Sequence, residues 1–289
     1  MSPLSLLGLY CVALVVFSLA GGALPQRVQM THTRTQLAMS LVSGLMLGIA
    51  FFHLLPHALM TLGLEQGLTV VMGWVVFGLI IMLLLLRLLH FHQPDYHSTG
   101  IADCAHEHAH AVPGAPVLTG HSVSWKGVLI GLGFHTLIDG IALGAAFLAA
   151  PHGHEGQLLA FGVFLAILMH KPLDAMSITA LMKAGGASLG YQRWANIAFA
   201  IICPLGALLF YGYAVVVGPI GVDFVAAALA FSAGAFVCIA LSDLLPEVQF
   251  HSHDRFKLTA VFLLGLGLSY LLATAGNEHT HAVASIVPL

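Results

Sequence analysis

The chain has 289 residues, of which 59% are hydrophobic and only 7% are charged. A soluble globular protein carries about 25% charged residues, so this chain could not cover its own surface in water. This composition excludes a soluble enzyme, a disulfide-rich secreted scaffold and a disordered chain. The formal net charge of −3 and the scattered basic residues give no reason to expect a nucleic-acid partner. The sequence therefore predicts an integral membrane protein that contacts the lipid bilayer.

A helix that spans the bilayer needs roughly 20 apolar residues, and eight stretches of this sequence qualify. All eight are expected to be helices, because an open strand would leave backbone polar groups unsatisfied in lipid. We therefore predict an all-α integral membrane protein with a single transmembrane domain over residues 1–289. The predicted spans are 4–23, 37–61, 68–89, 127–150, 158–182, 197–217, 224–245 and 258–275.

The basic residues predict how the chain is oriented. All of them except Lys171 lie in or beside the alternate loops that follow the first, third, fifth and seventh spans. Because Lys and Arg favour the cytoplasmic side of a membrane, these loops are predicted to be cytoplasmic and both termini to lie outside. The expected location is the cell membrane, either plasma or inner. The basic residues of the loops are Arg27, Arg34, Arg87, Lys126, Lys183, Arg193, Arg255 and Lys257.

A His-rich loop at about residues 90–126 joins the third and fourth spans and is predicted to be cytoplasmic. The chain has 18 histidines, twice its count of Lys and Arg. A tract of this kind can bind soft or borderline divalent metals loosely, and the alternative is a solvated linker without function. The histidines concerned are His90, His92, His97, His106, His108, His110 and His121.

Two of the predicted helices carry the same polar pair near the middle of the membrane. The fourth span has His135 and Asp139, and the fifth has His170 and Asp174. A spacing of four residues puts both side chains on one helix face, one turn apart. The two helices run antiparallel because a single loop joins them. If they pack together, His135 lies level with Asp174 and Asp139 lies level with His170.

Two imidazoles and two carboxylates are a suitable ligand set for a borderline divalent cation. Zn²⁺ fits best, and Fe²⁺, Mn²⁺, Co²⁺ and Cd²⁺ remain open alternatives. Ionisable groups at membrane depth are costly and usually functional. The sequence therefore predicts one metal site formed by the two pairs. Lys171 directly follows a predicted ligand, and its natural partners are Asp139 and Asp174.

A second repeated pattern stands near the end of the second and seventh spans. The first copy reads His53-Leu-Leu-Pro-His57 and the second reads Asp243-Leu-Leu-Pro-Glu247. The two spans run in opposite directions and are the middle helices of the first three and the last three. This arrangement predicts an inverted 3+2+3 repeat. The polar residues then mark an outer approach and an inner exit for a cation, lined by His53, His57, Asp243, Glu247, His251 and His253.

These features together resemble the ZIP (Zrt/Irt-like) family of divalent-metal transporters. The resemblance covers nearly the whole chain and rests on HTLIDG and HKPLD in the fourth and fifth spans, with FFHLLPHA and LSDLLPE in the second and seventh. It implies a 3+2+3 helix bundle, often a homodimer, that moves zinc, iron or related ions into the cytoplasm. It also implies that the transported ion is bound without any further cofactor.

The same resemblance carries the role of primary metal ligand onto His135, Asp139, His170 and Asp174. The family usually has Glu where this chain has its two Asp residues. Family members that hold two ions have an amide and a carboxylate beside the primary ligands. This chain has Thr136 and Lys171 at those positions, which is similar to members that hold a single ion.

Two other classes of function compete with transport. An intramembrane zinc-dependent hydrolase would need one open position on its metal for water, which a set of four ligands does not offer. A metal sensor or a purely structural membrane protein would not need polar residues on both sides of the central site. No nucleotide-binding P-loop is present, so ATP-driven pumping is not expected. We therefore expect a transporter rather than an enzyme.

Overall fold

The computed structural model describes residues 2–27, 32–88, 125–149, 154–217, 221–244 and 255–284. Within these ranges, eight helical stretches are long and apolar enough to cross a membrane, as predicted. The protein is thus all-helical in its described part, which fits a multi-pass membrane protein. Its helices are α1 (Pro3–Arg27), α2 (His32–Ile49), η1 (Ala50–Leu54), α3 (Leu55–Leu62), α4 (Leu64–Leu88), α5 (Trp125–Ala149), α6 (His154–Ala184), α7 (Leu189–Val217), α8 (Gly221–Ile239), η3 (Ala240–Leu244) and α10 (Arg255–Ala284).

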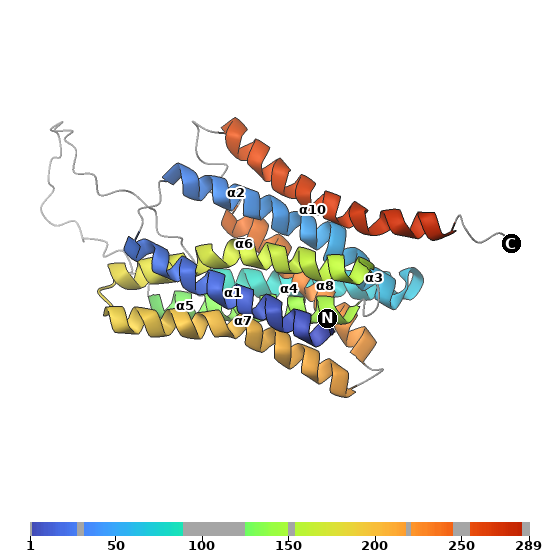
Figure 1. Ribbon diagram of the computed structural model, residues 1–289, viewed down its shortest axis with the longest axis horizontal. Coiled ribbons are helices and arrows are strands. Elements are labelled where there is room, and N and C mark those ends of the chain that lie inside the picture. The colour runs from blue at the N-terminus through green and yellow to red at the C-terminus, as the bar shows by residue number, and fades with distance from the viewer. Residues whose placement is uncertain are drawn as a thin grey trace, which may run out of the picture.

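Several helices extend beyond the predicted apolar spans. Helix α7 begins at Leu189 rather than at residue 197, and α10 ends at Ala284 rather than at residue 275. Hydropathy finds the part of a helix that is apolar enough for lipid, whereas the backbone stays helical into the polar residues on either side. In Figure 1, α1 begins and α10 ends toward the same end of the helix bundle, as an even number of spans requires.

The helices pack in two sets of four. Helix α1 packs along α6 and α5 along α7, while α2 packs along α10 and α4 along α8. Figure 1 shows α2 and α10 side by side at the edge of the bundle. The two sets meet where α5 contacts α8 and where α6 contacts α2. The helices that carry the two His/Asp pairs, α5 and α6, therefore belong to the same set and contact each other.

Glycines allow the backbones of the second set to approach each other closely. A Cβ at Gly44 of α2 would collide with the carbonyl oxygen of Phe262, and a Cβ at Gly265 of α10 would collide with that of Leu41. The α4–α8 pair has the same arrangement, in which Gly78 lies against Phe231 and Gly234 against Val75. In a membrane, close packing of this kind supplies much of the attraction between helices, because lipid tails are as apolar as the side chains.

In both copies of the repeated Leu-Leu-Pro pattern, the first leucine is the last residue of a short π-helical turn. The turn η1 ends at Leu54, two residues before Pro56, and η3 ends at Leu244, two residues before Pro246. Proline lacks an N–H group and crowds the carbonyl four residues earlier, and a wider turn accommodates it. After η1 the chain stays helical as α3, whose first residue Leu55 donates its N–H to Ala50. The first copy therefore lies inside a continuous helical stretch rather than at its last turn.

The glycine contacts lead to a test of how the helices are held together. Replacing Gly265 by Ala would place a methyl group 2.8 Å from the backbone nitrogen of Leu45, and overpacking of this kind destabilises a protein by about 1–3 kcal/mol. We expect a lower melting temperature for the detergent-solubilised Gly265→Ala protein. Gly267→Ala is the matched control on α10, because a Cβ there meets nothing within 4 Å. Equal melting temperatures for the two variants would contradict this account of α2–α10 packing.

Candidate metal site

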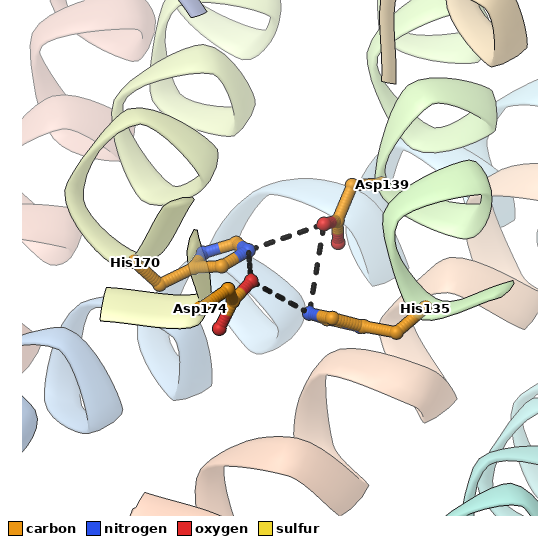
Figure 2. A group of neighbouring side chains, drawn as sticks. All are labelled: His135, Asp139, His170 and Asp174. Carbon is orange, nitrogen blue, oxygen red and sulfur yellow. Dashed lines mark hydrogen bonds and ion pairs between the residues drawn. The ribbon is translucent and has the colours of Figure 1, made fainter. Parts of the chain in front are cut away.

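Helices α5 and α6 bring the two His/Asp pairs together in one cluster (Figure 2). Each helix contributes a histidine and an aspartate spaced by four residues, so each pair projects from a single face. One ligand atom from each of the four side chains lies within 4.8 Å of the others. We call this group the His/Asp site; it consists of His135, Asp139, His170 and Asp174.

The distances within the His/Asp site agree with the expectation that, on antiparallel helices, each histidine lies level with the aspartate of the other helix. Between helices, Nε2 of His170 lies 3.2 Å from Oδ2 of Asp139, and Nε2 of His135 lies 3.5 Å from Oδ2 of Asp174. Along each helix the corresponding distances are 3.6 Å on α5 and 3.9 Å on α6. Figure 2 shows the dashed lines closing a ring in which imidazoles and carboxylates alternate.

The environment of His170 fixes which ring nitrogen faces the centre of the site. Its Nδ1 lies 2.8 Å from the carbonyl oxygen of Ala166, one turn earlier on α6. A carbonyl oxygen only accepts, so Nδ1 carries the hydrogen and donates it. In the neutral ring, Nε2 then keeps its lone pair and points it at the site. Fixing a histidine ligand through its other nitrogen is the usual arrangement at protein metal sites.

The His/Asp site is buried more deeply on α5 than on α6. Asp139 is 0% exposed and the two histidines are 2–3% exposed, whereas the side chain of Asp174 is 17% exposed. Three buried side-chain atoms of the site have no hydrogen-bond partner in the described part of the chain: Nδ1 of His135, Oδ1 of Asp139 and Oδ2 of Asp174. Buried polar atoms are normally satisfied, so the two unpaired carboxylate oxygens are available to accept a hydrogen bond or to contact a cation.

Lys171 places a positive charge directly against the His/Asp site. Its Nζ lies 2.7 Å from Oδ2 of Asp139 and donates a hydrogen bond of 2.8 Å to Oγ1 of Thr136. It also lies 3.9 Å from Oδ2 of Asp174 and 5.2 Å from the centre of the Phe199 ring. The side chain is 1% exposed. Of the two partners predicted for Lys171, Asp139 is the closer one.

Neighbouring helices hold α5 and α6 in place around the site. Gly140, the residue after Asp139, lies so close to α7 that a Cβ would collide with the carbonyl oxygen of Cys203. Gly21 of α1 makes a similar close approach to Pro172, between the two α6 residues of the site. The Phe236 ring of α8 stands edge-on to His170, with 6.4 Å between centroids.

Some of these neighbours leave a signal in the sequence and others do not. The carbonyl that fixes His170 could have been anticipated, because it is one helical turn earlier. Nothing in the sequence indicated that Phe199 and Phe236 approach the site, because they come from α7 and α8.

The residues predicted to line the pathway are only partly described by the structure. His53 is buried in η1, where its Nε2 donates to the carbonyl oxygen of Ser269 at 3.0 Å. His57 donates from Nδ1 to the carbonyl oxygen of His53 at 2.9 Å. Neither belongs to the His/Asp site. The backbone of Asp243 lies in η3, and its side chain falls outside the described residues, as do Glu247, His251, His253 and the predicted metal-binding histidines of residues 90–121.

The donor atoms of the His/Asp site fit a borderline divalent cation. Imidazole nitrogen and carboxylate oxygen are ordinary ligands of Zn²⁺, and the same set also accepts Fe²⁺, Mn²⁺ or Co²⁺. The four groups lie on two helices that are themselves packed against α1, α7 and α8. A cation there would be shielded from lipid and in contact with two formal negative charges.

Comparison with known proteins identifies the family. The family described as ZIP Zinc transporter matches residues 92–273, more than half of the chain and all four residues of the His/Asp site. Zinc transporter ZIP9 of Xenopus tropicalis is 26% identical over 88% of this chain and 89% of its own length. Zinc transporter ZIP9-B of Xenopus laevis is 33% identical over 44% of this chain, and zinc transporter foi of Drosophila melanogaster is 27% identical over 55%.

The extent of these matches differs. The aligned part of this chain spans 42% of the Xenopus laevis relative and 21% of the Drosophila relative, compared with 89% of the Xenopus tropicalis one. The resemblance inferred from the motifs on the second, fourth, fifth and seventh spans is confirmed by the family match. This chain is a multi-pass membrane protein and belongs to the ZIP zinc transporter family.

Proposed function

We propose that this chain transports zinc or a related divalent metal cation across a membrane, and that the ion passes through the His/Asp site. The observation that carries the proposal is the convergence of two imidazoles and two carboxylates within 4.8 Å on buried faces of α5 and α6. A bare cation in the bilayer is prohibitively costly. Four protein donors replace the water that the ion loses, which makes its passage through the bundle feasible.

The outer approach to the site is assigned to His53 and His57. On α6, Gly162, Ala166 and His170 are spaced by four residues and share one face. The His53 ring lies over that face, since a Cβ at Gly162 would stand 3.4 Å from its Cε1. His53 therefore lies two helical turns from His170 along the same face. Asp243, Glu247, His251 and His253 form the inner exit in this proposal.

The orientation of the chain follows from the distribution of charge in the sequence, and the direction of transport is the one that the family resemblance implies. The basic loops lie in the cytoplasm, both termini lie outside, and the ion moves into the cytoplasm across the cell membrane. The ion is the cargo, and no other cofactor is required. Association into a homodimer, which the family resemblance implies, remains a prediction of this proposal.

The helices are related as an inverted 3+2+3 repeat in this proposal. Both π-helical turns fall at corresponding positions, because the same number of residues separates His53 from Asp243 as separates Gly44 from Gly234. The interlocking glycines support the same relation: α2 packs on α10 as α8 packs on α4. Inverted repeats are typical of transporters that expose one site to the two sides of a membrane in turn.

A zinc-dependent hydrolase is the alternative that this proposal rejects. The HExxH pattern that zinc hydrolases carry on a helix occurs at His106-Glu107-His108-Ala109-His110, within the His-rich loop and outside the described residues. That pattern is separate in sequence from the His/Asp site. If the protein is a transporter, Glu107 has no catalytic role, and we expect Glu107→Gln to leave zinc uptake by proteoliposomes unchanged. Loss of uptake in this variant would show that Glu107 has a role that the proposal does not give it.

Removing single ligands tests the transport site. His170→Ala and Asp174→Ala each delete one of four donors, so metal flux into proteoliposomes is expected to fall by at least about tenfold. The measurement is uptake of radioactive zinc by equal amounts of folded protein. Ser177→Ala is the matched control: it lies one turn beyond Asp174 on α6, and its hydroxyl bonds only the carbonyl oxygen of Leu173 among the hydrogen bonds described. Flux near the wild-type level in both ligand variants would disprove the transport role of the site.

The number of bound ions tests the assignment of Thr136 and Lys171. Because Thr136 and Lys171 stand where two-ion members of the family have ligands, we expect about one zinc per protomer at the core. Elemental analysis should be made on protein whose loop histidines have been replaced by Asn, so that loop-bound metal is not counted. Two zinc ions per protomer that both survive this replacement would contradict the assignment.

A further inference from the structure

Lys171 is buried at the His/Asp site, and binding to the metal does not explain why it is there. It is not a ligand, because a protonated amine has no lone pair to offer a metal. Its Nζ nevertheless lies 2.7 Å from Asp139, nearer than either histidine of the site. It is 1% exposed and sits on α6 between His170 and Pro172, so it is built into the site rather than placed at its edge.

When no metal is bound, the site still needs a positive charge, because one of its two carboxylates is fully buried. Asp139 is 0% exposed, and an isolated buried carboxylate is strongly unfavourable unless it is paired and hydrogen-bonded. Lys171 provides that pairing, and Thr136 receives a second hydrogen bond from the ammonium. The Phe199 ring, 5.2 Å away, gives the ammonium a further favourable contact. The metal-free site thus contains one compensated carboxylate and one partly exposed carboxylate, Asp174.

We propose that Lys171 is the resident counter-cation of the metal-free site and that it weakens metal binding so that the ion can be released. This inference rests on the proposed function and deepens it. When no metal is bound, the ammonium neutralises Asp139, and that carboxylate can stay buried. When a divalent ion binds, two carboxylates and one ammonium leave the filled site with a net charge of +1.

The ammonium of Lys171 and a bound metal ion are both positively charged and repel each other. Without Lys171 the filled site would be neutral, and the empty site would hold an unpaired buried carboxylate. Both changes favour the metal-bound form, the first by removing repulsion and the second by raising the free energy of the empty form. A carrier that binds its cargo less tightly releases it more readily. Lys171 therefore sets affinity without touching the ion.

The test compares zinc affinity and thermal stability in full-length variants that lack the charge. Lys171→Met removes the ammonium while keeping most of the side-chain volume, and Lys171→Gln keeps a hydrogen-bond donor without charge. Lys171→Arg keeps the charge. Lys183→Met is the matched control, because it removes a positive charge from the exposed end of α6. Zinc Kd is measured by equilibrium dialysis, and melting temperature is measured with and without zinc in each protein, all in the background with the loop histidines replaced by Asn.

The expected result is a zinc Kd at least about tenfold lower in Lys171→Met than in the wild type. Its melting temperature should be lower without zinc and should rise more on zinc addition, as tighter binding requires. Lys171→Arg and Lys183→Met should keep a Kd near the wild-type value. If Lys171→Met does not fold without zinc but is recovered by purification with zinc, that outcome also supports a counter-cation role; Lys171→Gln then supplies the Kd.

An unchanged or higher Kd in folded Lys171→Met or Lys171→Gln would overturn the inference. That failure is distinct from failure of the proposed function. If the wild type binds no zinc at the core, or if His170→Ala binds it as tightly, the His/Asp site itself is wrong. If the wild type and His170→Ala differ as expected while the lysine variants bind zinc no more tightly than the wild type, only the role of Lys171 is wrong.

Discussion

The main constraint on this structure is that two carboxylates must be held inside a helix bundle that is otherwise largely apolar. Asp139 and Asp174 would be costly in the membrane unless cations accompany them. The protein surrounds them with two imidazoles and one ammonium, all within 4 Å of a carboxylate oxygen. A divalent ion can join this arrangement because the imidazoles supply neutral donors. The same negative charges that make the site costly to bury also attract cations.

Packing around the site gives these charges their positions. The backbones of α5 and α7 come close at Gly140, next to Asp139, and those of α1 and α6 come close at Gly21 and Pro172. Larger residues at these glycines would separate the helices and spread the donors. The second set of helices is held in a similar way by Gly44, Gly265 and their counterparts. Small residues at helix crossings therefore link the sequence to the geometry of the site.

Much of the fold and the centre of the site could be predicted from the sequence. Eight apolar spans are recognisable because lipid demands long helices, and the two four-residue spacings place each His/Asp pair on one helix face. A single loop between α5 and α6 makes them antiparallel, which predicts the level pairing of His170 with Asp139. These inferences use only local periodicity and connectivity, which a sequence displays directly.

Other features depend on contacts between distant parts of the chain. The approach of Phe236 to His170 joins α8 to α6, and the bond from His53 to Ser269 joins η1 to α10. No spacing rule reports such contacts. The choice of Asp139 over Asp174 as the nearer partner of Lys171 was also open, because both carboxylates lie within reach of a long flexible side chain. The sequence does not predict the π-helical turns, because a proline indicates that a helix is disturbed but does not determine how the backbone adjusts.

The central claim is that His135, Asp139, His170 and Asp174 together bind the transported ion. The most direct measurement is X-ray absorption at the zinc edge of the purified protein, with the loop histidines replaced by Asn. The account predicts a first shell of nitrogen and oxygen alone, with two imidazoles at about 2.0–2.1 Å. It also predicts that one imidazole is lost in His170→Ala. A shell that contains sulfur, or one that the His170→Ala change leaves intact, would contradict the account.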